Sequence, residues 1–175
     1  MNSKIPEFRE KLQKKLNPGR YEHSLSVAFT CICLAMRYGY PIDQAEVAGM
    51  LHDCAKGYDN DTIIRHCEKK GIEITEDERK APAVLHAKYG AWLAENTYDI
   101  HDQEILDAIA CHTTGKPAMG LLDKILYVAD YIEHNRAFPG VEQARDIAQV
   151  SLDRAVAYET ARTVEHLAHQ GLPIY

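Results

Sequence analysis

Apolar residues recur at helical spacing along most of this chain, and this pattern limits the possible folds more than any other feature. Long alternation of apolar and polar residues, which is typical of half-buried strands, is missing. Glycine and proline breaks separate the periodic segments. We expect a charged first helix that ends at Asn17-Pro18-Gly19, helices over 21–37, 43–54, 59–70, 86–96, 102–111 and 121–133, and two helical stretches that end at Gly171. The predicted fold class is all-α.

Several predicted helix ends carry residues that stabilise such positions. Thr75 and Glu78 have the spacing of a capping box, and Asp102 suits an N-cap. Pro82 suits the first turn of the helix that carries His86. These residues support the division into helices.

Length and composition indicate an ordinary globular chain. Its 175 residues contain no repeat, low-complexity segment or linker, so we expect one domain over residues 1–175. The net charge of −6 argues against nucleic acid as a partner. The segment 1–15 is too charged for a signal peptide, and no apolar run reaches membrane-spanning length, which predicts a cytoplasmic protein. We interpret the five cysteines, which form no CxxC pair, as small buried residues in a reducing compartment: Cys31, Cys33, Cys54, Cys67 and Cys111.

Two His-Asp dipeptides differ in their surroundings. His101-Asp102 lies in a polar stretch before a helix, where His101 is solvated. His52-Asp53 instead closes the apolar segment 45–51, where a buried polar pair needs partners. A metal ion would satisfy both side chains. His23, near the start of an apolar helix, and Asp130, within the apolar run 125–132, are suitable further ligands. Taken alone, His23 also fits a hydrogen-bonded core histidine and Asp130 a salt bridge with arginine.

The order of these residues is similar to that of the HD superfamily of metal-dependent phosphohydrolases. Arg20 to Ser24, Leu51 to Lys56, His112-Thr113-Thr114-Gly115 and Ala129 to Glu133 resemble the YqeK family of bacterial HD proteins. The resemblance extends from Asn17 to Arg145. It implies a single-domain helical bundle with a dinuclear metal site and symmetrical hydrolysis of diadenosine tetraphosphate to two ADP by a hydroxide that bridges the metals.

The resemblance also implies the ligands: His23, His52, Asp53 and Asp130 for the HD set, and His86 and His112 for the second metal. Asp53 is the expected bridge, because only a carboxylate offers two oxygens to two ions. A mixed histidine and carboxylate set suits iron, manganese, zinc or cobalt, divalent or mixed-valence, and the resemblance favours iron. The sequence departs from the expected pattern after Glu133, where we expect proline and find His134. His134 is either an exposed histidine at the end of the helix or a contact near the site.

Charged and small residues flank these ligands and suit a phosphate substrate. We assign Lys56 a catalytic role beside Asp53, and Arg20, Lys56, Thr113, Gly115 and Arg136 to substrate binding. Taken alone, each of the four side chains could instead be solvated at the surface, and Gly115 could merely close a turn. Tyr175, at the end of the chain, could stack on a nucleobase, although frayed termini are more common.

Several rival functions stay open at this point. They are another HD nucleotide phosphohydrolase, a nucleotide-binding regulatory module without catalysis, and a structural metal site. Gly39-Tyr40-Pro41 matches a motif of cyclic-dinucleotide phosphodiesterases, but it lies before His52-Asp53 and we interpret it as a turn. The presence of all six ligands argues against a decayed site, and the helical surface is compatible with a homodimer.

Overall fold

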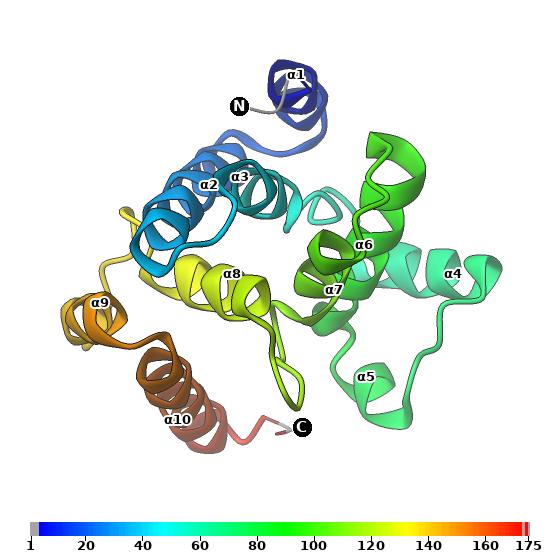
Figure 1. The fold of residues 1–175 in the computed structure, drawn as a ribbon. Helices are drawn as coiled ribbons and strands as arrows, with labels where there is room; N and C mark the ends of the chain where they lie inside the picture. Colours follow the sequence, from blue (N-terminus) through cyan, green and yellow to red (C-terminus); the bar gives the residue numbers. More distant parts are fainter. Residues whose placement is uncertain (1–3, 173, 175) are drawn as a thin grey trace.

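The computed structural model describes residues 4–172 and 174, which contain helices and no β-strand (Figure 1). The predicted all-α class is therefore confirmed for this part of the chain. Its elements are α1 (Ile5–Lys15), α2 (Pro18–Tyr38), α3 (Ile42–Leu51), α4 (Asn60–Lys70), α5 (Glu76–Lys80), a 3₁₀ helix (Pro82–Val84), α6 (Leu85–Tyr98), α7 (Gln103–Cys111), α8 (Leu121–Ile132), α9 (Val141–Val150) and α10 (Leu152–Gln170).

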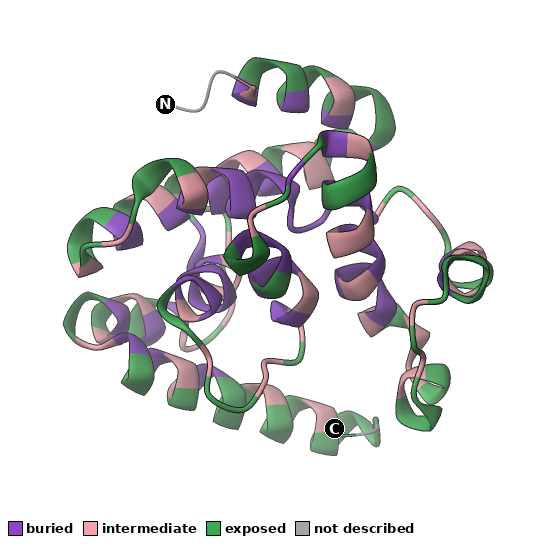
Figure 2. Ribbon diagram, turned by 45° about the vertical axis from the view of Figure 1, so that its right-hand side comes forward, coloured by how far each residue is buried: buried purple, intermediate pink, exposed green. Residues whose placement is uncertain are grey.

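Helices α2, α3, α7 and α8 form the centre of the bundle. Helix α2 packs along α3 and α8, and α7 packs against α6, α3 and α8. The pair α9 and α10 covers the other side of α8 (Figure 1). The inward faces of these helices are buried (Figure 2), with side chains such as Val27, Leu51, Ile109 and Leu126 fully inside. This core, whose buried residues run from Ile5 to Ala155, fixes the helix ends that carry the polar cluster described below.

Several helix ends match the sequence expectations. Thr75 and Glu78 form the predicted capping box of α5, and Asp102 caps α7. Asn17 caps α2 by accepting a hydrogen bond from the Arg20 N–H, so this helix begins at Pro18 rather than near Tyr21. The Asn-Pro-Gly sequence thus starts the second helix as well as ending the first.

Other expectations were wrong. Helix α3 ends at Leu51, because the Cys54 N–H turns back to the Leu51 carbonyl at 3.0 Å, so His52 and Asp53 lie in a tight turn rather than inside the helix. Pro82 begins the short 3₁₀ helix, and α6 starts only at Leu85. Cys33 is exposed, because it lies on the outer face of α2 while Cys31 points into the core. Tyr175 lies outside the described residues.

A search of the described residues finds no helix with the length and apolar character needed to cross a membrane.

Gly49 allows the close approach of α2 and α3. A Cβ atom at this position would lie 2.7 Å from the Cα of Ala28 and 3.0 Å from the sulfur of Cys31. Because the nearest of these atoms belongs to the backbone, the two helices would have to move apart to accept a side chain.

We expect Gly49→Ala to lower the free energy of unfolding by about 1–3 kcal/mol, since it overpacks this helix contact. Gly19→Ala is the control: a Cβ there meets nothing closer than the Asn17 side chain at 3.7 Å, and alanine favours helices. Urea denaturation of both variants measures the effect. Equal stability of the two variants would contradict the close packing at Gly49.

Candidate metal centre

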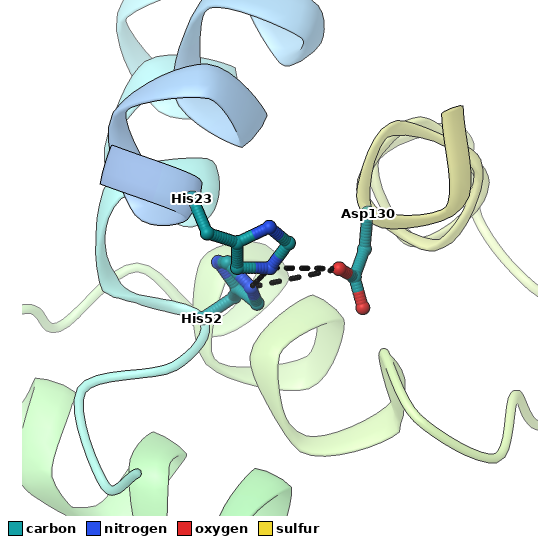
Figure 3. Close-up of side chains that lie close together, drawn as sticks. All are labelled: His23, His52 and Asp130. Carbon is teal, nitrogen blue, oxygen red and sulfur yellow. Dashed lines mark hydrogen bonds and ion pairs between the residues drawn. The ribbon is translucent and has the colours of Figure 1, made fainter. Parts of the chain in front are cut away.

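Six polar side chains meet inside the bundle, and they are the six predicted from the sequence: His23, His52, Asp53, His86, His112 and Asp130. They come from α2, the turn after α3, α6, the residue after α7, and α8. All are buried except Asp130, which is half-buried. Figure 3 shows how His23, His52 and Asp130 converge from three separate elements.

Asp53 lies between two groups of histidines. Its Oδ2 is 3.4 Å from His52 Nε2 and 3.7 Å from His23 Nε2. Its Oδ1 is 3.3 Å from His86 Nε2 and 3.7 Å from His112 Nε2. Each carboxylate oxygen thus faces a different pair of imidazoles, which is the arrangement that a ligand bridging two ions requires.

Each side of Asp53 has its own set of donor atoms. On the Oδ2 side, His23 Nε2 is 3.0 Å from Asp130 Oδ1 and 3.3 Å from His52 Nε2. On the Oδ1 side, the Nε2 atoms of His86 and His112 are 3.1 Å apart. The donor atoms of His23, His52 and Asp130 lie within 4.8 Å of one another, as do those of His52, Asp53 and His112. We call the group of His23, His52 and Asp130 the His23 half of the centre. The pair His86 and His112 is the His86 half.

The outer nitrogens of the four imidazoles are all occupied. Nδ1 of His52, His86 and His112 lies 2.6–2.8 Å from a backbone carbonyl three residues earlier, and Nδ1 of His23 lies 3.2 Å from Glu133 Oε1. Carbonyl and carboxylate oxygens only accept, so each Nδ1 donates and each neutral ring turns an Nε2 lone pair inward. Lone pairs that face each other at 3.1 and 3.3 Å need a cation between them. The residues therefore fit bound metal ions.

The carboxylates at the centre stay ionised. Burial by itself raises the pKa of Asp53, but when protons rather than metal ions occupy the inner nitrogens, the positive charge on His52 and hydrogen bonds from His112, His52 and His86 hold this pKa well below its ordinary range. Burial likewise opposes ionisation of Asp130, and the hydrogen bond from His23 with the charges on His52 and His112 outweighs it, so this pKa is also lowered. Burial alone would lower the pKa of His52, but the negative charge on Asp53 and its hydrogen bond raise it. A proton and a metal ion thus compete for the same histidine nitrogen.

Glu133 was quoted in the sequence motif but given no role, and the structure gives it one. Its side chain is 2% exposed; Oε1 accepts from His23 Nδ1, and Oε2 accepts from the Asn135 N–H at 2.7 Å. It therefore fixes the orientation of His23. Its position three residues after Asp130, at the end of an apolar helix, was the signal in the sequence.

Arg145 lies on α9 and holds the segment 133–136 in place. No pattern in the sequence pointed to this arginine. Its guanidinium group donates to the carbonyls of Ile132 at 2.9 Å, Glu133 at 2.8 Å and Arg136 at 3.0 Å. These carbonyls belong to the last residue of α8 and to the segment after it, where helical partners are missing. Arg145 thereby keeps Glu133 against His23.

The predicted substrate contacts separate into two groups. Arg20 Nη1 lies 2.7 Å from Asp53 Oδ2, Arg136 Nη2 lies 2.8 Å from Asp130 Oδ1, and Thr113 Oγ1 lies 3.2 Å from His86 Nε2. The salt bridge considered for Asp130 thus exists beside its place in the cluster. The Lys56 backbone N–H donates to the Asp53 carbonyl at 2.9 Å, but among the described residues neither its ammonium group nor Gly115 has a hydrogen bond or ion pair with the side chains of the cluster. Burial lowers the pKa of Lys56, and the negative charge on Asp53 opposes this effect. Gly115 has a φ of +69° and closes the turn after α7.

His134 does not share a helix face with Asp130. Helix α8 ends at Ile132, and His134 is exposed in the segment that follows. The interpretation as an exposed histidine at the helix end is therefore confirmed.

A helical bundle whose helix ends enclose four histidines and two aspartates defines a class of α-helical proteins with a buried side-chain cluster that could hold metal. The HD domain family matches residues 20–135, which contain all six cluster residues. The chain belongs to the HD domain family.

Relatives extend this similarity over most of the chain. A protein of Bacillus subtilis (strain 168), named "Bis(5'-nucleosyl)-tetraphosphatase, symmetrical", is 37% identical over 94% of this chain and 88% of its own. One of Halalkalibacterium halodurans with the same name is 40% identical over 91% of this chain and 85% of its own. A crystal structure from Clostridium acetobutylicum, described as a predicted HD superfamily hydrolase involved in NAD metabolism, has a TM-score of 0.95 and 36% identity, and the match covers 97% of this chain and 90% of that one.

We expect Glu133→Gln to weaken metal binding by about 10–100-fold, because an amide can accept only one of the two hydrogen bonds that the carboxylate accepts. Glu142→Gln is the control, since Glu142 is exposed on α9 and contacts the same Arg145 without reaching the cluster. Titration against a competing chelator gives both dissociation constants. If the two variants bind metal equally well, Glu133 does not orient His23 as described.

Proposed function

We propose that this protein hydrolyses dinucleoside polyphosphates and cleaves diadenosine tetraphosphate symmetrically into two ADP. The observation that carries the proposal is the position of Asp53, whose two oxygens face separate pairs of histidines. The names of the relatives from Bacillus subtilis and Halalkalibacterium halodurans support the same activity. We treat residues 1–175 as one HD-type domain, because the core that surrounds the cluster continues into α10 through Leu152 and Ala155.

The proposed cofactor is a pair of transition-metal ions, with iron as the first choice and manganese, cobalt or zinc as alternatives. His23, His52 and Asp130 would hold one ion, His86 and His112 the other, and Asp53 both. Bound ions would supply an activated water and neutralise phosphate charge. The carbonyl and carboxylate partners of the four Nδ1 atoms support this assignment, because they hold one ring proton on Nδ1 and aim Nε2 inward.

The reaction adds one water across the central P–O–P bond. The water oxygen forms a bond to one of the two middle phosphorus atoms, and the bridging oxygen leaves with the other half, so both products are ADP. The leaving group is itself a phosphate, so it needs charge stabilisation more than a proton. The protein therefore has to hold and neutralise a long anion.

Five side chains or backbone positions are proposed to bind that anion. Arg20, Arg136 and Thr113 already lie beside the cluster. Lys56 follows Asp53 by one tight turn, and its ammonium group has neither a hydrogen bond nor an ion pair among the described residues. We propose that it pairs with a phosphate during catalysis, and that Gly115 lets the backbone of the turn after α7 approach the substrate.

The experiment that tests this function is product analysis with anaerobically purified protein. We expect about two metal ions per chain and ADP as the sole product from diadenosine tetraphosphate, with activity lost on chelation. NAD is the comparison substrate, because the Clostridium acetobutylicum relative is described by its link to NAD metabolism. Cleavage of NAD without release of ADP from the tetraphosphate would contradict the proposal. Bound metal without turnover of either substrate would direct attention to other nucleotides.

The two halves of the centre can be tested separately. Asp53→Ala should abolish hydrolysis and loosen both ions, whereas His86→Ala should abolish hydrolysis but retain one ion, because the His23 half stays complete. His101→Ala, in the exposed second His-Asp dipeptide, is the control and should match the wild type. Metal analysis with steady-state kinetics measures both effects. Full activity of Asp53→Ala, or unchanged metal content of His86→Ala, would disprove the assignment.

A further inference from the structure

A polar cavity of about 580 Å³ adjoins the His23 half of the centre. It opens between the start of α2 and the segment after α8. Its lining comes from these two places only: Asn17, Gly19, Arg20, Glu22, His23, Glu133, Asn135 and Arg136. We propose that this cavity binds the phosphates and ribose of one nucleotide half of the substrate, an inference that rests on the proposed function.

The position of the cavity suits a substrate that extends beyond the cluster. His23 lines the cavity, and the Nε2 atom of its ring lies 3.0 Å from Asp130 Oδ1. A phosphate chain whose central bond lies at the cluster can therefore extend past His23 into this cavity. A cavity of this volume lies within the range of sites that hold small ligands of nucleotide size.

Two guanidinium groups give the cavity its affinity for anions. Arg20 contacts Asp53 through Nη1 alone, and Arg136 contacts Asp130 through Nε and Nη2. A guanidinium group has five N–H donors, so each arginine keeps donors for a further acceptor. Both side chains are about one-third exposed where they line the cavity. Phosphate oxygens match this fork geometry.

The rest of the lining suits ribose better than a base. Glu22, Asn17 and Asn135 provide acceptors and amide donors for hydroxyl groups, while Glu133 is already engaged by His23 and Asn135. The lining, as far as the structure describes it, includes no aromatic side chain on which a base could stack. We therefore expect this half of the substrate to be recognised by its phosphates and sugar, with little selection of its base.

Gly19 allows a test that leaves the cluster untouched. It lines the cavity in the first turn of α2, and a Cβ there has open space up to the Asn17 side chain at 3.7 Å. Gly19→Glu puts a negative charge beside the phosphates, and a glutamate in the first turn of a helix favours folding. Gly19→Gln is the matched control, because it adds nearly the same volume without the charge.

We expect Gly19→Glu to raise both the KM for diadenosine tetraphosphate and the Kd for ADP by about tenfold or more relative to Gly19→Gln, through repulsion of like charges. Unfolding stability and metal content should not fall in either variant. Calorimetric titration of ADP into metal-loaded protein gives the Kd independently of turnover. Equal KM and Kd values in the two variants would overturn the proposal.

A substrate with one adenosine replaced by uridine tests the second part of the proposal. It should be cleaved to ADP and UDP with at most a few-fold loss in kcat/KM, since one base is not selected. A much larger loss would overturn the inference that this half is recognised without its base. A wild-type protein that does not cleave diadenosine tetraphosphate at all would refute the proposed function itself, which is a different outcome from equal behaviour of the two Gly19 variants.

Discussion

The ionised carboxylate of Asp53, only 2% exposed, is the feature on which the rest of the arrangement depends. An isolated charge in such a place would be strongly unfavourable. Imidazoles from α2, α6 and the turns after α3 and α7, together with the Arg20 guanidinium, surround it. The helices therefore have to meet at their ends around one point, and the close contact of α2 and α3 at Gly49 brings His23 and His52 to that point.

One local device orients three of the four histidines. His52, His86 and His112 each donate from Nδ1 to the carbonyl three residues earlier, in Gly49, Ala83 and Ile109. His52 and His112 follow directly after helices, where the last carbonyls have no helical partner, and His86 follows the 3₁₀ helix. The same bond satisfies a free carbonyl and aims Nε2 away from the helix. A histidine just past a helix end is thus prepared as a ligand by its own backbone.

This device explains how much the sequence could predict. Helical periodicity and the breaks at Pro41, Gly71 and Gly140 indicated the helices, and the order of histidines and aspartates indicated six residues that do meet in space. The tight turn at Leu51 was missed because its hydrogen bonds, from Cys54 to Leu51, Lys56 to Asp53 and Tyr58 to Ala55, span three residues where a helix spans four, and no residue type in the sequence marks that change. Arg145 was missed because its carbonyl partners are backbone atoms about ten residues away in sequence, and no side-chain pattern records such contacts.

The charges around the centre connect the proposed metal ions to the proposed substrate. Asp53, Asp130 and Glu133 are balanced by Arg20, Arg136 and Lys56, so the site is close to neutral while its histidines are neutral. Two divalent ions, as proposed, would leave a surplus of positive charge buried in a chain whose net charge is −6. An anion of similar charge in the site would offset this surplus. A tetraphosphate, with one negative charge on each phosphate, matches that surplus, whereas a ligand with a single phosphate would leave most of it uncompensated.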